Sequence, residues 1–373
     1  MNSSKYNYLA DNSTDGTSQF GEVGFNFSTQ PHERLHLGFQ ILARELGSTG
    51  KYEPRLDWGF ADYQINKYIS LKVGRFFSPW GLHNEGRDVD ILRNTIIPVE
   101  VIYSEDAREI SLMKGLELHG NFNIGKKNNL EYRFAKGNID INLNSRFSLE
   151  LESRLSNLYS KFIVAKGGPL IANPLTQIDM NIDHITAYGF VWNTWVDGLR
   201  LSYTSFEPDI DINAQIDISA QAQLPSPQYT FYDFSKDFKT LSLEYVKNKW
   251  SYTYERLTYA VDAYTILGKI PLSDVFSYYH QITHRFNEKY ELGIVKAKSK
   301  NKLKTNQGRI DDSINDLAFT IRVDLDESWV FKVEYHDLKG IGSLRTTINP
   351  GLSNTNNQGV NWDMIVAKVT YSF

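Results

Sequence analysis

Segments of about ten residues in which apolar and polar side chains alternate recur along almost the whole chain. Trp329, Phe331 and Val333, for example, share one face of such a segment, and Lys332 and Glu334 share the other. Charged side chains on the second face argue against a barrel filled by an apolar core, because an unpaired buried charge is very costly. The pattern predicts many β-strands around a wet interior. A soluble sheet with one solvated face would alternate in the same way and remains the alternative.

The connections between these segments alternate between short and long. Outer-membrane barrels have short periplasmic turns and longer external loops, and this alternation matches them. With an opening strand before residue 28 and a closing strand, we expect an all-β protein, a transmembrane antiparallel β-barrel of 16 to 18 strands. Most of the short connections carry Asn, Asp, Gly or Pro, and they fall at residues 30–33, 65–68, 125–128, 155–157, 196–198, 247–249, 287–289 and 324–327.

Composition excludes several classes of protein. No stretch approaches the roughly 20 apolar residues of a membrane helix. With no Cys there can be no disulfide framework and no thiolate metal site. A net charge of −4 with 13% aromatic residues fits neither a nucleic-acid-binding protein nor a disordered chain. Aromatic residues gather near the short turns, where a membrane-interface girdle is expected: Trp195, Trp250, Phe286, Tyr290, Trp329 and Phe373.

The last thirteen residues, 361–373, alternate in the same way and end on an aromatic residue. We expect them to form the closing strand, so that residues 1–373 make a single barrel domain. The chain opens on polar residues without the basic, apolar and small-residue regions of a signal peptide. We therefore expect a mature protein of the bacterial outer membrane from which a signal peptide has been removed.

One long connection, from about residue 76 to residue 114, combines many apolar residues with charges of both signs. Connections of this length are usually functional or disordered, and the apolar content argues against disorder. We expect the segment to fold inward, pack on the wall and narrow the lumen with opposed charges. The alternative is a surface loop whose charges are solvated.

Two parts of the chain resemble a family of proteobacterial porin-like outer-membrane proteins, of the trimeric diffusion-porin type. The first runs from Gly74-Arg75 through Pro79-x-Gly81 and Asn84-Glu85-x-Arg87-Asp88 to Tyr103, and the second covers residues 316–340. The resemblance implies a Gram-negative, trimeric porin that lets small hydrophilic solutes or ions diffuse through a water-filled channel. Trp80 and Asp90 depart from the family pattern and leave the solute preference open.

We expect the charge filter of this channel to lie where the inward segment faces the wall. Arg75 is the weakest member, because it shares strand parity with the apolar Leu71 and Val73. An alternative function is a barrel that anchors or binds a surface assembly through its long external loops, with the pore incidental. The expected constriction residues are Arg75, Glu85, Arg87, Asp88, Asp90, Arg93, Glu117 and Lys332.

No pattern in the sequence supports catalysis or a cofactor. His280 and His284 have a spacing that binds zinc on a helix, but their segment alternates like a strand. Neither a Ser and His arrangement nor a glycine-rich phosphate loop is present. We expect no enzyme activity, no metal and no cofactor.

Lysines recur at every second position from residue 296 onward. On the parity of Leu292 and Ile294 they would extend the lipid-facing side above the membrane, so we expect Lys296, Lys298 and Lys300 to contact lipopolysaccharide phosphates. A solvated, lysine-rich loop tip is the alternative. The expected partners are outer-membrane lipid, lipopolysaccharide, small solutes and two further copies of the chain, but not nucleic acid.

Overall fold

The computed structural model describes the chain except for a set of short gaps. Within the ends of several strands only the backbone is described, at residues 2–4, 175–181, 210–216, 228–235, 261–265, 268–273, 302–305 and 308–311. The gaps are residues 1, 5, 9, 11, 48–49, 126, 142–144, 146, 150–151, 154–155, 157–159, 161–163, 165–174, 217–227, 236, 266–267, 306–307, 312, 346–347, 350–351 and 353–359.

The protein is an all-β sheet in which every pairing between strands is antiparallel. Its strands are β1 Asn2–Ser4, β2 Phe20–His32, β3 Leu35–Leu46, β4 Arg55–Gln64, β5 Ser70–Phe77, β6 Leu112–Ile124, β7 Asn128–Asp140, β8 Leu175–Asn193, β9 Leu199–Ile216, β10 Gln228–Ser235, β11 Phe238–Lys247, β12 Trp250–Thr265, β13 Gly268–Arg285, β14 Tyr290–Thr305, β15 Gly308–Asp311, β16 Ile314–Asp324, β17 Trp329–Gly340 and β18 Asn361–Tyr371. The helices are short: η1 Ser13–Asp15, η2 Asp90–Leu92, α1 Glu100–Tyr103 and α2 Glu105–Ser111. No helix in the described part of the chain is long and apolar enough to span a membrane.

The eighteen strand segments occupy sixteen places side by side in the sheet. Fifteen of these places hold long strands, and the sixteenth holds the short β1. β10 and β11 share the position between β9 and β12, and β15 and β16 share the position beside β14. β1 pairs with only part of β18. The ladder runs unbroken from β2 to β18, and within the described residues no ladder joins β18 back to β2.

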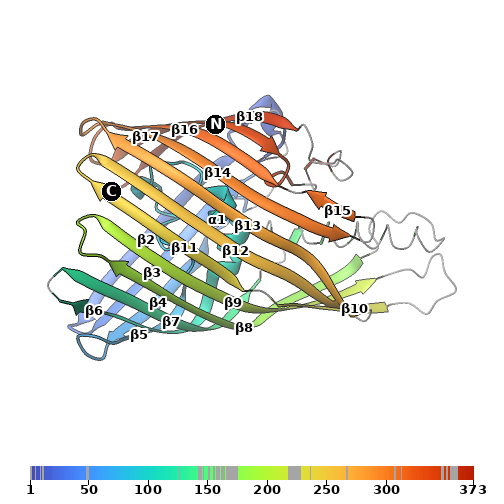
Figure 1. Cartoon of the computed structure of the whole chain (residues 1–373), viewed down its shortest axis with the longest axis horizontal. Helices are drawn as coiled ribbons and strands as arrows, with labels where there is room; N and C mark the ends of the chain where they lie inside the picture. The colour runs from blue at the N-terminus through green and yellow to red at the C-terminus, as the bar shows by residue number, and fades with distance from the viewer. Residues whose placement is uncertain are drawn as a thin grey trace.

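Short turns lie at one end of the sheet, and at the other end the connections range from two residues, at 266–267, to long segments such as residues 78–111 (Figure 1). Seven of the predicted turns are confirmed, because each joins two consecutive strands. The turn predicted at residues 155–157 lies largely outside the described residues. We call the end that carries residues 33–34 and 325–328 the turn end, and the opposite end of the sheet the loop end.

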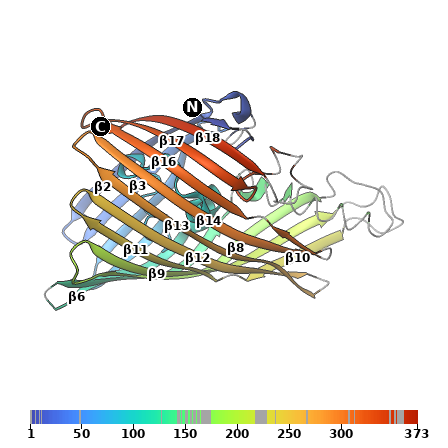
Figure 2. The same cartoon turned by 45° about the horizontal axis from the view of Figure 1, so that its top comes forward.

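Burial separates two faces on strands such as β17. In β17, Val330, Lys332 and Glu334 are buried, whereas Trp329 and Tyr335 are exposed. We call the buried side the inner face, because residues 78–111 pack on it, and the other side the outer face. Figures 1 and 2 show the sheet curling around α1 in both views. The aromatic residues expected at the membrane interface are all exposed: Trp195, Trp250, Phe286, Tyr290, Trp329 and Phe373.

The apolar band on the outer face ends at nearly one level across four strands. Ile294, Phe319, Tyr335 and Ile365 are neighbours in register and all are exposed. Two residues further toward the loop end, the outer face is polar on three of these strands, with Lys296, Asp337 and Asp363, whereas β16 still carries the exposed Leu317. At the same level the inner face changes from polar to apolar, and Leu338, Trp362 and Met364 are buried there. A protein crossing a lipid layer requires such a band of limited height.

Candidate functional site

Residues 78–111 connect β5 to β6 and lie against the inner face. Gly81 begins the segment with a φ of 63°, a conformation that side chains with a Cβ rarely adopt. An added Cβ would also lie 2.3 Å from the Tyr103 hydroxyl and 2.8 Å from Glu255 Oε1. Ser104 caps α2 by accepting a hydrogen bond from the backbone N–H of Ala107 at 3.0 Å. Trp80 is buried and donates to the Ile102 carbonyl at 3.1 Å, so the segment also packs on itself.

One side of the segment is tied to β3 and β4 by ion pairs. The Arg108 guanidinium contacts Asp57 of β4 at 2.5 Å and Asp88 of the segment at 2.8 Å. All three side chains are less than one-tenth exposed. Arg44 of β3 contacts Glu105 at 2.8 Å. Burial opposes the charge of Arg108, but Asp88 and Asp57 raise its pKa well above the usual range.

A second group of charges ties the start of the segment to β5, β6 and β7. Arg133 of β7 contacts Glu85 at 2.9 Å and the fully buried Glu117 of β6 at 2.5 Å. Lys72 of β5 contacts Glu117 at 3.1 Å. Arg133 is the main cause of a lowered pKa of the Glu85 carboxyl. The charges on this wall therefore pair directly and do not face one another across water.

The Glu255 carboxylate of β12 joins the middle of the segment to three strands. It accepts hydrogen bonds from the Leu82 backbone N–H at 2.8 Å and from the hydroxyls of Tyr103, Tyr279 and Ser242, each at 2.6 Å. The side chain is 0% exposed. Four donors around one carboxylate satisfy a buried charge without a cation. Burial and the neighbouring Glu255 raise the pKa of Tyr103 well above its usual range, so its hydroxyl stays a donor.

The far end of the segment is tied to β16, β17 and β18. The Glu334 carboxylate accepts from the backbone N–H groups of Ile96 at 2.5 Å and Ile97 at 3.2 Å. Lys332 Nζ lies 3.1 Å from an Asp90 carboxylate oxygen and donates to the Asp90 carbonyl at 2.6 Å. Burial alone would raise the pKa of Asp90, but Lys368, Lys332 and Arg93 lower it to about 2. Arg322 of β16 donates to the Ile91 carbonyl at 2.6 Å.

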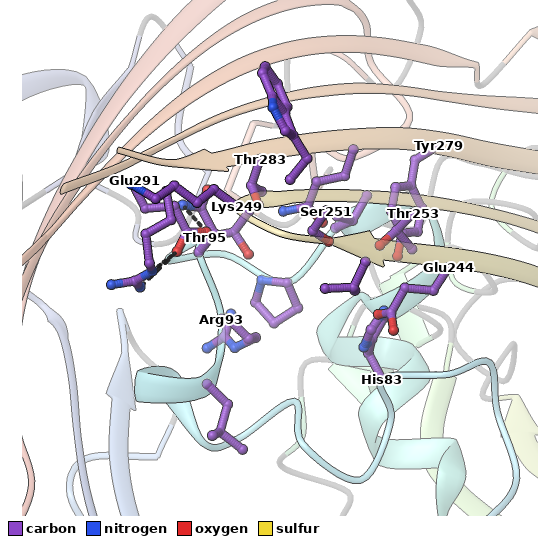
Figure 3. Close-up of a pocket in the computed structure, with 18 of the residues that line it drawn as sticks. His83, Arg93, Thr95, Glu244, Lys249, Ser251, Thr253, Tyr279, Thr283 and Glu291 are labelled. Carbon is purple, nitrogen blue, oxygen red and sulfur yellow. Dashed lines mark hydrogen bonds and ion pairs between the residues drawn. The ribbon is translucent and has the colours of Figure 1, made fainter. Parts of the chain in front are cut away.

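A cavity of about 900 Å³ remains between the segment and strands β11 to β14. Figure 3 shows His83, Arg93 and Thr95 on the segment facing Thr253, Thr283 and other residues on the strands. Residues of the turns at 248–249 and 287–289 also line the cavity, so it lies toward the turn end. Half of the strand residues that line it are uncharged and polar: Ser251, Thr253, Tyr279, Gln281 and Thr283.

The charged lining of this cavity comes from both the segment and the strands. His83 Nε2 lies 3.6 Å from a carboxylate oxygen of Glu244 on β11. Asn94 donates to Glu291 of β14 at 3.0 Å, and Glu291 pairs with Arg285 at 2.8 Å. Five basic and three acidic side chains line the cavity: Arg87, Arg93, Lys249, Arg285 and Lys289 against Glu244, Glu288 and Glu291.

A second cavity, of about 30 Å³, lies on the other side of the segment. Thr95, Pro98 and Val99 line both cavities. The second cavity is also lined by apolar inner-face residues, among them Ile314 and Leu338. Residues 95–99 therefore form a partition between a large space at the turn end and a space that holds about one water molecule.

The expected constriction residues fall into three groups. Glu85 and Arg93 are accessible, and Arg93 lines the large cavity. Arg75 has the outer-face parity of Val73 and donates to the Leu56 carbonyl at 3.3 Å, away from the segment. The remaining residues are buried where the segment meets the wall or folds on itself: Arg87, Asp88, Asp90, Glu117 and Lys332.

Arg87 shows how such a residue acts through the hydrogen bonds that it donates, although it also borders the large cavity. It is 2% exposed, and it donates to the carbonyls of Tyr103 at 2.7 Å and Ser104 at 2.8 Å. Burial lowers the pKa of Arg87 to about 10, so it stays charged at neutral pH. Its role in the structure is to hold the turn at 84–89 against the start of α2.

Sequence reasoning did not select several residues that the structure places at the contacts of the segment. They are charged side chains at inner-face positions of alternating strands, so strand parity could have identified them. Strand parity gives the face on which a side chain lies, but it does not show which of these side chains contact residues 78–111. The residues are Arg44, Asp57, Lys72, Arg133, Glu255, Arg322 and Glu334.

Two other groups singled out in the sequence lie away from the segment. Lys296 and Lys300 are exposed on the outer face, and Lys298 has the same parity. His280 and His284 lie on β13, as the alternation predicted. Within the part of the chain that the structure describes, no cluster of His, Cys, Asp or Glu is arranged to hold a metal ion.

No family model and no curated protein sequence matches this chain. Several solved structures match in fold. OmpF of Salmonella typhi, in complex with daunomycin, is 11% identical with a TM-score of 0.52, over 94% of this chain and 89% of that one. The in-vitro folded OmpT, an outer-membrane protein of Vibrio cholerae, and the anion-selective porin of Comamonas acidovorans are each 9% identical with a TM-score of 0.51, over 95% of this chain and 90% of theirs.

At these identities the likeness establishes the fold and not the solutes. The matched proteins include porins and an outer-membrane channel. The expectation drawn from residues 74–103 and 316–340 is thereby confirmed at the level of architecture: the chain has the fold of the outer-membrane porins.

Proposed function

We propose that the protein is an outer-membrane porin in which residues 1–373 close into one barrel around a water-filled passage. Small hydrophilic solutes or ions cross it by passive diffusion, and no bond is made or broken. The observation that supports this most is the cavity beside residues 78–111. The segment is fixed by buried contacts to β3–β7 and β12–β18, yet about 900 Å³ remains against β11–β14.

The expected constriction residues have two roles in this proposal. Arg93 and Glu85 act on passing ions directly. Arg87, Asp88, Asp90, Glu117 and Lys332 shape the aperture indirectly, because they hold the segment in place. Residues 95–99 form the narrowest part, since they line both the large and the small cavity. Arg75 has no part in the filter, because it has the outer-face parity.

The charges that line the cavity support a modest preference for anions. Basic side chains outnumber acidic ones there by five to three, or by four to three without the buried Arg87. One protein of similar fold is named an anion-selective porin. The acidic stretch near residues 207–228, which by itself would favour cations, lies mostly outside the described side chains. A wide vestibule with mixed charges biases ion passage without excluding either sign.

We further propose the outer membrane as the location and a homotrimer as the assembly. The apolar band that ends at Ile294, Phe319, Tyr335 and Ile365 supports contact with lipid or with neighbouring subunits. The resemblance at residues 74–103 to trimeric diffusion porins supports the assembly. Lys296, Lys298 and Lys300, just above the band, are placed to contact the phosphates of lipopolysaccharide.

The test of the channel is single-channel conductance of the purified protein in a planar bilayer under a salt gradient. Current steps in groups of three, with a reversal potential that indicates anion preference, are the expected result. A protein that inserts, as shown by protease protection, but carries no current would contradict the proposal. That outcome would favour the alternative of a barrel that anchors a partner through its external loops.

A further inference from the structure

Contacts with the wall surround most of residues 78–111. Ion pairs hold the segment to β3–β7, and buried carboxylates hold it to β12 and β17. Trp80 fills the space toward β9 and β11, because its ring centre lies 5.4 Å from that of Phe206 and 4.8 Å from that of Phe238. Residues 95–99 differ from these contacts, since a cavity lies on each side of them. A route from the turn end to the loop end can therefore be traced through this partition.

The partition is fixed to the wall at its start. Asn94 donates to Glu291 of β14 at 3.0 Å and accepts from the Thr320 hydroxyl of β16. Gly293 of β14 permits this close approach, because an added Cβ would collide with Asn94 Oδ1 and Thr320 Oγ1. Two backbone N–H groups of the partition then donate to Glu334 of β17. The distance between the partition and β14 is therefore set by contacts with three strands.

Apolar side chains form the contact between the partition and the wall. Pro98 and Val99 line both cavities, and Val295 of β14 and Ala318 of β16 line the small one. Val99 packs on the apolar cluster that contains Val295 and Ala318, which are 3% and 2% exposed. Thr95 is the polar residue that borders both cavities, and it is buried. We call Pro98, Val99, Val295 and Ala318 the apolar seal.

Polar groups lie on both sides of the apolar seal. The large cavity on the turn side is lined by hydroxyl, amide and charged groups, among them Thr253 and Gln281. In the small cavity on the other side, His336 Nδ1 lies 3.0 Å from a carboxylate oxygen of Asp316. His336 Nε2 lies 3.3 Å from a carboxylate oxygen of Glu334. A solute that moves between the cavities therefore leaves polar groups, passes apolar ones and meets polar groups again.

An apolar constriction affects ions and uncharged solutes differently. Such a constriction gates a pore by losing its water. Moving an ion out of water costs far more free energy than moving a hydroxyl group, because a charge is much more strongly hydrated. The apolar seal should therefore slow ions of either sign more than it slows uncharged solutes of similar size. The charges of the large cavity bias the sign of the ions that cross, but they do not lower this barrier.

We propose that the apolar seal is the highest barrier in the passage, so that the protein admits small uncharged solutes with hydroxyl groups more readily than ions. The inference rests on the proposed function of the chain as a channel. Solutes pass when water enters the space between the partition and β14. The hydroxyl and amide side chains of the large cavity supply hydrogen-bonding partners for such solutes on the turn side.

Val295→Thr tests the apolar seal, because it adds a hydroxyl group at almost unchanged side-chain volume. Single-channel conductance in potassium chloride measures the passage of ions, and the swelling of proteoliposomes in arabinose measures the passage of an uncharged solute. We expect the conductance to rise by about threefold and the swelling rate by less than about 1.5-fold. Val246→Thr makes the same change at a 45% exposed side chain that lines the large cavity, and it should alter neither.

Two further variants keep the test decisive if Val295→Thr folds poorly. Val99→Thr adds the hydroxyl group from the segment, where the side chain is only half-buried, and should also raise the conductance. Ala318→Val enlarges the apolar seal and should lower the conductance by about half. Retention of compact mobility in detergent gels identifies the variants that are folded.

Three results would overturn the inference. Equal conductance in the parent, Val295→Thr and Val99→Thr would place the main barrier elsewhere, with the channel itself intact. Equal increases in conductance and in arabinose swelling would mean that the apolar seal limits the width of the passage and does not select by charge. Absence of current and of swelling in the parent and in every variant would contradict the channel, and the inference with it.

Discussion

The two sides of residues 78–111 meet the wall in different ways. Toward β3–β7 the contacts are ion pairs between buried or half-buried side chains, such as Arg108 with Asp57 and Arg133 with Glu117. Toward β11–β14 the segment faces a cavity lined by hydroxyl and amide side chains. The comparison shows that a charged side chain on the inner face can either fasten the segment or line the cavity. Which of the two it does depends on the partner that its side chain contacts.

The largest loss of stability is expected when an ion pair between the segment and β3–β7 is removed. Arg108→Met leaves the Asp57 and Asp88 carboxylates buried without their cation, and we expect a loss of about 3–5 kcal/mol in the free energy of unfolding. Urea unfolding in detergent, followed by tryptophan fluorescence, measures it. Lys114→Met, which breaks the exposed pair with Asp140, is the matched control and changes the free energy by less than about 0.5 kcal/mol. Equal losses in the two variants would show that Arg108 does not fasten the segment.

Glu255→Leu tests the middle of the segment. It removes the acceptor for Leu82, Tyr103, Tyr279 and Ser242 together, and we expect a cost of about 2–4 kcal/mol with larger fluctuations in single-channel current. Tyr279→Phe removes one of these hydrogen bonds and should cost about 1 kcal/mol without added noise. A Glu255→Leu channel as quiet as the parent would mean that the segment is held without this carboxylate.

Acid should loosen the segment both at its far end, through Asp90, and on its β3 side, through Glu105. The pKa of Asp90 is lowered to about 2, and the pKa of Glu105 is lowered too, because Arg44, Arg87 and Arg108 outweigh its burial. A depressed carboxyl pKa stabilises the folded state above the unfolded value of about 4, and this stabilisation is lost as the pH falls toward 2.

We therefore expect stability to be flat from pH 8 to pH 5 and to fall below pH 4, with Asp90 contributing about 2 kcal/mol. Unfolding free energies at pH 7, 5, 3 and 2 measure the change. Asp90→Asn removes the contribution of this one carboxylate, so its curve should fall less steeply below pH 4. Identical curves for the parent and Asp90→Asn would contradict the assignment.

On the cavity side the expected effect is on ions rather than on stability. Glu244→Gln removes a negative charge from the lining, and the ratio of anion to cation permeability should rise by about twofold. The reversal potential under a salt gradient measures this ratio. Glu131→Gln, on the inner face of β7 and outside the cavity lining, is the control and should leave the reversal potential unchanged. A similar shift in both variants would place the filter elsewhere.

The smallest effect concerns the outer face. Replacing Lys296, Lys298 and Lys300 by Gln should reduce the lipopolysaccharide that copurifies with the protein by about half, with conductance unchanged. A phosphate assay on the purified protein measures it. Replacing Lys239 and Lys247, which have the outer-face parity on β11, by Gln provides a control of similar charge change. Equal losses in the two variants would indicate nonspecific binding.

Much of the architecture was predictable because it depends on local pattern. Alternation identified the strands and the short turns, and parity alone placed Lys296, Lys298 and Lys300 on the outer face and Arg75 with its apolar neighbours. The length and apolar content of the connection after β5 predicted that it packs on the inner face, and Trp80, Ile96 and Ile102 are buried. The number of strands was less accessible, because β10 with β11 and β15 with β16 each share one position.

The site was less predictable than the fold. Charges in residues 78–111 were expected to face one another across water, but Asp88 meets Arg108 and Asp90 meets Lys332 in buried contacts. In the sequence, Glu255 and Glu334 are polar residues of alternating segments, like many other residues of the inner face. Only the path of the segment brings backbone N–H groups of Leu82, Ile96 and Ile97 to them.

The sequence by itself therefore determined which side chains lie on the inner face and which on the outer face, since strand parity follows from the two-residue repeat of an extended backbone. It also determined where the chain turns. The tertiary structure decided which charges are paired, where the cavity lies and which strand edges stay open. These depend on contacts between residues far apart in the chain, such as Ile96 with Glu334, and no local repeat encodes such a contact.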